Sequence, residues 1–150
     1  VCSALESEHL QYYVCDFPLP QLTDHPRVIC LPHLGASTAE AQENCAVMAV
    51  EQVKAFLEHG HIIHSVNFPE VKMTRATGYR LALVNRNVPN MVAQITSLLS
   101  ERQMNIANMT NRSRDDVAYT LIDLEQRCDV DALAQLQNIS GVIRARLIDV

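Results

Sequence analysis

A histidine stands between a short apolar run and a helix-start signal, in the stretch PHLGAST at residues 32–38. Functional sites in α/β folds lie at the ends of such strands. An imidazole with an ordinary pKa of about 6.5 can exchange a proton with a substrate hydroxyl or ketone near neutral pH. His33 is therefore a candidate acid/base for a reaction in which hydride moves to or from a nicotinamide. A histidine that merely bonds a neighbouring carbonyl is the alternative, and spacing alone favours it.

A second group of polar side chains consists of asparagines in NRNVPNM at 85–91 and MNIANM at 104–109. Amide side chains both donate and accept, so Asn85, Asn87 and Asn105 together could bind the ammonium, carboxylate and hydroxyl of a small amino acid. The free amides of a helix beginning after Asn87 would add affinity for the carboxylate. In the structural alternative, Asn87 only caps that helix and the other two asparagines form turns.

Other candidate ligands give weaker signals. His59, His61 and His64 form H-x-H-x-x-H, but no cysteine or carboxylate completes a metal set, and a helix end favours histidine by itself. We predict no metal. The five cysteines are widely spaced without a C-x-x-C, which predicts reduced thiols and a cytoplasmic protein rather than a disulfide framework.

Composition excludes two classes of partner. Twelve Lys and Arg against seventeen Asp and Glu give a net charge of −5, and no basic stripe predicts nucleic-acid binding. The sequence has no apolar run of the roughly 18 residues that a membrane span requires. The remaining expectation is a globular protein with a small-molecule ligand.

The elements expected around His33 are two strands and a long helix. Residues 3–10 predict a short helix, 12–18 a strand, and 27–32 a buried parallel strand closed by proline. Ser37 and Glu40 have the spacing of a capping box, and Gly60 favours a helix C-terminus, so a helix of roughly 22 residues is expected between them. Its apolar face would consist of Ala46, Val50, Val53 and Leu57.

The asparagines are expected on a second, separate fold. Strands are predicted at 80–85, 105–112, 117–125 and 142–148, with helices at 88–102 and at 130–138, the latter capped by Asp129. This βαββαβ order predicts an α+β ferredoxin-like domain, with both helices on one face of an antiparallel sheet and the other face and edges exposed. Residues 61–77 have no clear period and predict an extended linker that acts as a hinge.

Three motifs in order carry a resemblance to a known family: CDFP at 15–18, PHLGASTAEAQEN at 32–44 and SVNFP at 65–69. They resemble the C-terminal part of the D-2-hydroxyacid dehydrogenase family, in the branch that oxidises 3-phosphoglycerate to 3-phosphohydroxypyruvate with NAD in serine biosynthesis. The resemblance implies that residues 1–60 are the end of a Rossmann-like nucleotide-binding domain and the adjoining substrate domain, and that 78–150 are an ACT regulatory domain. It also implies that His33 is the catalytic histidine. The residues around the nicotinamide would be Cys15, Asp16, His33, Leu34, Gly35 and Ala36.

The same resemblance implies that Asn85, Asn87 and Asn105 contact a serine effector, and that ACT domains pair into a homodimer. Two departures accompany it. Where the family has a glutamate that pairs with the catalytic histidine, this chain has Leu-Pro-Gln at 19–21. Where many relatives have a histidine and a glycine, this chain has Asn85 and Asn90. The Gly-rich phosphate-binding turn and the substrate-binding arginine would lie upstream, so these 150 residues alone should not catalyse. The competing interpretation is a non-catalytic amino-acid-binding ACT module.

Overall fold

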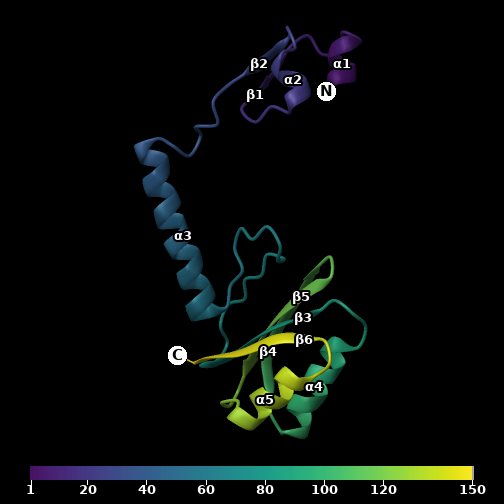
Figure 1. Ribbon diagram of the computed structural model, residues 1–150. Coiled ribbons are helices and arrows are strands. Elements are labelled where there is room, and N and C mark those ends of the chain that lie inside the picture. The colour runs from purple at the N-terminus through teal and green to yellow at the C-terminus, as the bar shows by residue number, and fades with distance from the viewer. Residues whose placement is uncertain (150) are drawn as a thin grey trace. The chain divides into compact units, whose positions relative to one another are not determined.

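The computed structural model describes residues 1–149, and the chain divides into two compact units, residues 1–47 and 48–150 (Figure 1). Each unit has its own secondary structure, joined through one long helix. We describe them separately because each carries one of the two candidate sites.

The first unit contains two short helices and a two-stranded parallel sheet. They are α1 (Cys2–Glu6), β1 (Tyr13–Cys15), α2 (Pro20–Thr23) and β2 (Val28–Cys30). The parallel pairing is confirmed, whereas α1 ends at Glu6 instead of Leu10, and α2 was not predicted. The prediction that 27–32 is a buried strand is wrong here: Ile29 is 50% exposed, because the small unit has few apolar side chains to cover it. Two strands alone do not make a Rossmann-like sheet.

Helix α3 (Ala39–His59) begins one residue later than the predicted capping box suggests. The side chain of Thr38, not Ser37, accepts a hydrogen bond from the amide of Ala41 at 3.1 Å, which is the geometry of an N-cap. The helix ends at Gly60 as predicted, and Gly60 has the left-handed φ of +70° that ends helices without strain.

The second unit contains the predicted βαββαβ fold. Its elements are β3 (Tyr79–Arg86), α4 (Met91–Glu101), β4 (Ile106–Arg114), β5 (Val117–Leu124), α5 (Val130–Asn138) and β6 (Val142–Asp149). The sheet order is β4-β5-β3-β6 and every pairing is antiparallel. The carboxylate of Asp129 accepts from the amide of Ala132 at 2.6 Å, so the predicted cap of α5 is confirmed. The ferredoxin-like prediction is therefore confirmed for this unit.

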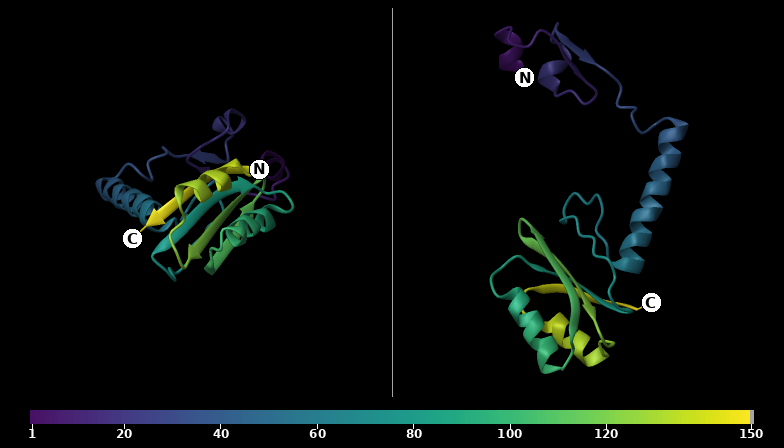
Figure 2. Two further views of the ribbon diagram at one scale, coloured as in Figure 1. Left: turned by 90° about the horizontal axis from the view of Figure 1, so that it is seen from below. Right: turned by 180° about the vertical axis from the view of Figure 1, so that it is seen from behind.

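Both helices of this domain lie on one face of the sheet (Figure 2). The core between them is apolar and almost fully buried, as alternation along the strands requires. It consists of Leu81, Leu83, Ile95, Leu99, Met104, Ile122, Leu124, Cys128, Ala132, Leu136 and Ala145. This core fixes the start of α4 against the end of β3, where the asparagines lie.

The other face of the sheet is not open, in contrast to the prediction. Val71 and Met73, from the segment predicted to be an extended linker, are buried against it together with Ala82, Tyr119, Leu121 and Ile148. Ile62 and Val71 also form an isolated antiparallel bridge. Residues 61–77 lack helix and strand, as predicted, but apolar side chains at 71 and 73 attach them to the sheet. The boundaries at residues 60 and 78 stay a prediction.

The C-terminal carbonyls of α3 are hydrogen-bonded to the sheet of the same unit. Arg146 donates to the carbonyl of Phe56 at 2.6 Å and its guanidinium lies 4.4 Å from the centre of the Phe56 ring. Arg80 donates to His59 at 2.9 Å, and the hydroxyl of Tyr119 donates to Gly60 at 2.7 Å. Carbonyls that a helix end leaves without intrahelical partners are thus satisfied by side chains of the sheet.

Arg80 also forms a fully buried ion pair with Asp123. Its Nε and Nη2 donate to the two carboxylate oxygens at 2.6 and 2.9 Å, a bidentate arrangement, and Asp123 accepts a third bond from the amide of Ala76 at 2.7 Å. This network ties the end of the 61–77 segment to β3 and β5, so the segment does not have the free ends expected of a hinge. Within residues 1–149, no helix has the length and apolarity needed to cross a membrane.

Candidate functional site

The first candidate site lies at the C-terminal ends of β1 and β2. The Nδ1 atom of His33 lies 3.0 Å from a carboxylate oxygen of Asp16, and the ring of Phe17 meets the imidazole edge to face at 5.7 Å between centroids. Both members of the ion pair are more than half exposed, so the pair contributes at most about 1 kcal/mol to stability. Its significance is orientation: a carboxylate on Nδ1 leaves Nε2 free to meet a substrate.

The backbone around His33 is open. A Cβ at Gly35 would meet no atom within 4 Å, and Leu34 is 58% exposed. Cys15 ends one parallel strand and Asp16 follows it directly, and the loop with His33 follows the other strand. Strand ends of this kind are where α/β folds bind nucleotides. The structure thus brings the residues predicted around a nicotinamide to the ends of two neighbouring strands.

The second candidate site is a cavity of about 430 Å³ where β3 ends and α4 begins. Four of its lining residues are asparagines, and helix amides and apolar side chains complete it. The lining residues are Asn85, Asn87, Val88, Asn90, Met91, Val92, Ala93, Asn111 and Ala118. A cavity of this size and mixed lining suits a small polar ligand.

Asn85 is the deepest polar residue of this cavity, with 1% of its surface exposed. Its amide nitrogen donates to the carbonyl of Arg86 at 2.8 Å, whereas its Oδ1 atom is buried without a hydrogen-bond partner among residues 1–149. A buried acceptor without a partner costs about 1–3 kcal/mol. The Oδ1 atom of Asn85 is therefore a hydrogen-bond acceptor without a donor, and an N–H or O–H group of a ligand could donate to it.

The start of α4 provides the complementary groups. Asn90 is the N-cap residue and adopts a left-handed φ of +71°, a conformation that asparagine tolerates better than most other residues. Its side chain makes no capping hydrogen bond, so the first amides of α4 remain available to an anion. The alternative in which Asn87 caps this helix is wrong, because the Asn87 amide nitrogen donates to the carbonyl of Asp115 at 2.9 Å.

Asn105 does not join the other two asparagines within one chain. It precedes β4 at the end of the sheet where Ile106 pairs with Leu124, whereas Asn85 pairs with Ala118 at the opposite end of β5. Its amide nitrogen donates to a carboxylate oxygen of Glu125 at 3.1 Å. The structure thus brings together Asn85 and Asn87 and separates Asn105 from them by most of the length of a strand.

The sequence-based prediction missed Asn111 as part of the cavity wall. Asn111 pairs with Thr120 across the strands, and its amide nitrogen donates to the Thr120 hydroxyl at 2.6 Å. Alternation along 105–112 places Asn111 on the same face as Met109, which is the signal that could have found it. The strand pairing that brings Asn111 and Asn85 into the wall of the same cavity could not be predicted from the sequence.

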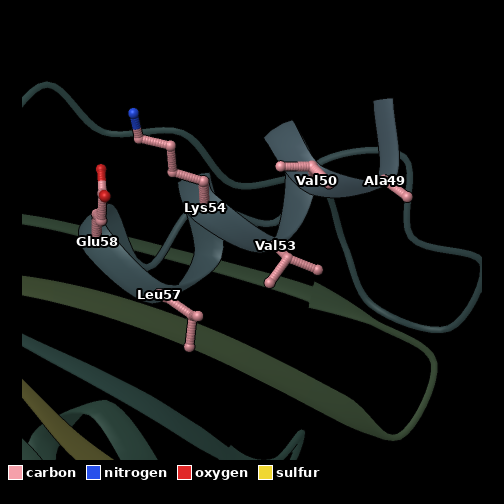
Figure 3. A pocket seen from close by; sticks show the side chains of 6 residues that line it. All are labelled: Ala49, Val50, Val53, Lys54, Leu57 and Glu58. Atoms are coloured by element: carbon pink, nitrogen blue, oxygen red, sulfur yellow. The ribbon is translucent and has the colours of Figure 1, made fainter. Parts of the chain in front are cut away.

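Two other features carry less chemistry. Within residues 1–149, no three His, Cys, Asp or Glu side chains gather as a metal site, and His61 instead contacts the carbonyl of Met73 at 3.1 Å. A second hollow, of about 440 Å³, lies along α3 and is lined by Ala49, Val50, Val53, Lys54, Leu57 and Glu58 (Figure 3). All six residues belong to one helix, so this hollow is a shallow surface rather than an enclosed site.

The apolar face predicted for α3 is exposed. Val50 is 67% exposed, Val53 and Leu57 are each 56% exposed, and α3 contains no buried residue. The pattern of apolar residues therefore predicted the helix correctly, and within residues 48–149 no other segment covers Val50, Val53 and Leu57.

The fold of residues 79–149 defines the class of the domain: it is a ferredoxin-like domain with a polar cavity at the start of α4. Sequence comparison is more specific. The chain is 32% identical, over 99% of its length, to D-3-phosphoglycerate dehydrogenase of Escherichia coli K12, and it spans 39% of that protein. The resemblance to the C-terminal part of the D-3-phosphoglycerate dehydrogenases is therefore confirmed.

Further relatives agree. The D-3-phosphoglycerate dehydrogenase of Haemophilus influenzae is 33% identical over 85% of this chain, which covers 31% of that protein. A putative D-3-phosphoglycerate dehydrogenase of Schizosaccharomyces pombe is 33% identical over 85% of this chain and 29% of its own length. No family model matches the sequence.

Among solved structures, similarity is weaker and concerns part of the chain. The ACT domain of GTP pyrophosphokinase from Chlorobium tepidum has a TM-score of 0.38 at 17% identity, covering 46% of this chain and 94% of that one. The regulatory subunit of aspartate kinase from Thermus thermophilus has a TM-score of 0.39 at 16% identity, covering 46% of this chain and 48% of that one.

Proposed function

We propose that this chain is the C-terminal part of an NAD-dependent D-3-phosphoglycerate dehydrogenase, and that its βαββαβ domain is an ACT domain that binds serine as a feedback effector. The observation that carries the effector proposal is the buried, unpaired Oδ1 atom of Asn85 in the wall of the cavity. The sequence relationship to the dehydrogenases supports the proposal for the parent protein.

The geometry suits an α-amino acid in one orientation. Its ammonium group would donate to Oδ1 of Asn85, which supplies the hydrogen bond that this buried acceptor lacks. Its carboxylate would lie at the free amides of α4, where the helix dipole adds attraction. A serine hydroxyl would reach Asn87, whose Oδ1 is still able to accept a hydrogen bond.

Asn105 would enter the site from a second copy of the chain. It lies at the far end of the sheet from Asn85, so a single chain cannot place both on one small ligand. Strand β4 forms one edge of the sheet and, apart from Thr110, its side chains are exposed. Exposed edges favour pairing between copies. We therefore propose a homodimer of ACT domains with the effector held between the partners.

In the parent enzyme, His33 would take the proton from the substrate hydroxyl while NAD accepts the hydride. Asp16 would orient His33 through Nδ1 and so perform the role for which the family uses a glutamate. The nicotinamide would lie against Cys15, Asp16 and the loop from His33 to Ala36. Catalysis is expected in the cytoplasm and only with the upstream domains present.

The alternative is a non-catalytic amino-acid-binding module, and it is supported by one observation: the asparagine cavity lies wholly within the second unit. The two functions differ in the upstream sequence. An upstream sequence with an intact G-x-G-x-x-G followed by a substrate-binding arginine would support the dehydrogenase. An upstream sequence that lacks these motifs would support the non-catalytic amino-acid-binding module.

The effector proposal is tested by an NMR titration of the chain with L-serine, with glycine and L-alanine as ligand controls. We expect saturable shifts at Asn85 and Asn87, and an affinity loss of about tenfold or more in Asn85→Ala, because the buried acceptor contributes over 1 kcal/mol. Asn138→Ala, on the exposed end of α5, is the matched control and should leave the affinity unchanged. The absence of shifts at millimolar serine, or equal affinity in Asn85→Ala, would overturn it.

A further inference from the structure

Two cysteines lie side by side at the end of the two-stranded sheet. Cys15 is the last residue of β1, Cys30 is the last residue of β2, and the two are Cα partners in the parallel pairing. The amide of Leu31 donates to the carbonyl of Cys15 at 2.9 Å, which fixes this register. Paired residues of neighbouring strands project to the same face, so both thiols lie on one side of the sheet.

The spacing of the two residues suits a covalent bond. Neighbouring strands lie about 4.8 Å apart, and disulfides form where Cα atoms are roughly 4.4–6.8 Å apart. The remaining cysteines differ in position: Cys2 is on α1, Cys45 is on α3, and Cys128 is buried in the core of the second unit. Tertiary structure therefore singles out one pair among five thiols that are far apart in sequence.

We propose that Cys15 and Cys30 are a redox-active dithiol, which forms an intrachain disulfide on reaction with a small-molecule disulfide of the glutathione type. This modification site is independent of the effector function proposed above. It also differs from the nicotinamide contact predicted for Cys15, because the reduced thiol is the form that would occupy the cofactor position.

The reaction proceeds in two exchange steps. The exposed Cys30 gives up its proton and its thiolate attacks one sulfur of the small disulfide, which releases one small thiol and leaves a mixed disulfide on Cys30. The Cys15 thiolate then attacks the Cys30 sulfur, forms the Cys15–Cys30 bond and releases the second small thiol. The protein loses two electrons and two protons, and the small disulfide is reduced to two thiols.

The environment sets the order of the steps. Cys15 is partly buried, and this burial, followed by the neighbouring Cys30 thiol, raises the pKa of the Cys15 thiol. The thiolate is the attacking form, so the closing step should accelerate as pH rises toward that raised pKa. Exposed Cys30 is the entry point and Cys15 is the resolving thiol.

The disulfide would tie together the two strand ends that carry the first candidate site. Asp16 follows Cys15 directly, and His33 lies three residues after Cys30. The Nδ1 atom of His33 lies 3.0 Å from a carboxylate oxygen of Asp16. A bond at this point fixes the backbone on both sides of the Asp16–His33 pair. Oxidation would thus act on the geometry of the proposed acid/base.

The test treats the native chain with oxidised glutathione, blocks the remaining thiols with an alkylating reagent, and digests with trypsin and a glutamate-specific protease. Cleavage after Glu6, Glu8, Arg27, Glu40, Glu43 and Glu51 places Cys2, Cys15, Cys30 and Cys45 on four separate peptides. Mass spectrometry then reports every pairing. We expect a linked pair of peptides 9–27 and 28–40, with Cys2 and Cys45 alkylated.

Single variants separate the steps. Cys15→Ser should accumulate glutathione on Cys30, whereas Cys30→Ser should show neither the link nor rapid modification of Cys15. The same reaction in urea should give mixed pairings at lower yield, which shows that folding selects the pair. Native linkage of Cys15 or Cys30 to Cys2 or Cys45 with equal yield, or alkylation of both thiols after full exposure to oxidant, would overturn the proposal.

Discussion

At the scale of single residues, environment changes what a side chain can do. Asp16 was expected only near a nicotinamide, and the structure also places it on Nδ1 of His33. Residues 19–21, where the resemblance leads one to expect a glutamate, are Leu-Pro-Gln, and Pro20 begins α2 there. The role of Asp16 as the partner of a catalytic histidine is a proposal that rests on this 3.0 Å contact. Asn85, a turn-forming residue type, is instead buried with an unpaired oxygen.

Tyr119 gives a prediction on pH. Burial raises the pKa of its hydroxyl from 10 to about 12, so the unfolded chain loses this proton first as pH rises. The unfolded state then binds fewer protons than the folded state, and stability is lost between pH 10 and about 12. We expect a loss of roughly 3 kcal/mol from this residue, measured by urea unfolding as a function of pH.

Tyr119→Phe is the matched variant for this measurement. It lacks the ionisable group and the bond to the carbonyl of Gly60, so its stability is lower at neutral pH but falls less steeply above pH 10. The buried Cys128, whose pKa is raised to about 11 by burial, titrates in both proteins and cancels in the comparison. Parallel pH profiles for the two proteins would contradict the assignment.

At the scale of elements, the end of α3 is the best-determined junction. Three side chains of the sheet, those of Arg80, Tyr119 and Arg146, bind the last carbonyls of the helix and Gly60. The guanidinium of Arg75 also donates a hydrogen bond to the backbone carbonyl of Glu58 at 3.2 Å. The segment 61–77, which was expected to act as a hinge, therefore begins at a helix end whose carbonyls accept hydrogen bonds from side chains of the second unit.

Gly60 lets the end of α3 pack closely against the sheet. This close packing gives a prediction for Gly60 and Gly78, the two glycines that flank residues 61–77. A Cβ at Gly60 would lie 2.8 Å from Cδ2 of Leu121 and 3.0 Å from Cδ1 of Ile148, at a φ of +70°. Gly60→Ala should lower the free energy of unfolding by about 1–3 kcal/mol.

Gly78→Ala is the control for this substitution. A Cβ there meets nothing within 4 Å, and its φ is not in the left-handed region, so we expect a change within about 0.5 kcal/mol. Urea unfolding followed by circular dichroism measures both variants. Equal effects of the two substitutions would mean that close packing at Gly60 does not hold in solution.

At the scale of the whole molecule, the chain consists of two units with separate cores. The first contains Leu5 and Leu22 as its buried apolar side chains, whereas the second has two continuous clusters on the two faces of its sheet. Units that each have their own core can unfold separately. The chain should therefore not unfold in one two-state transition.

Calorimetry tests this division. Leu83→Ala, in the main core of the second unit, should lower the stability of the major transition by about 2–5 kcal/mol and leave the minor one unchanged. Leu22→Ala should affect only the minor transition, in which residues 1–47 unfold. A single transition shifted by both substitutions would show one cooperative unit.

The sequence by itself determined the local structure of this protein. Periodicity gave the strands and helices of the βαββαβ domain, Asp129 predicted the start of α5, and Gly60 predicted the end of α3. These features depend on residues close in the chain, whose conformational preferences act locally. Three short motifs also predicted the relationship to the dehydrogenases that the comparisons confirmed.

Only the tertiary structure decided which side chains meet. The register of β1 and β2 pairs Cys15 with Cys30, and the pairing of β3, β4 and β5 brings Asn111 toward Asn85 while holding Asn105 at the other end. Burial of Val71 and Met73 likewise depends on a sheet assembled from distant segments. Contacts of this kind depend on strand register and packing across long stretches of chain, which the local pattern of residues does not specify.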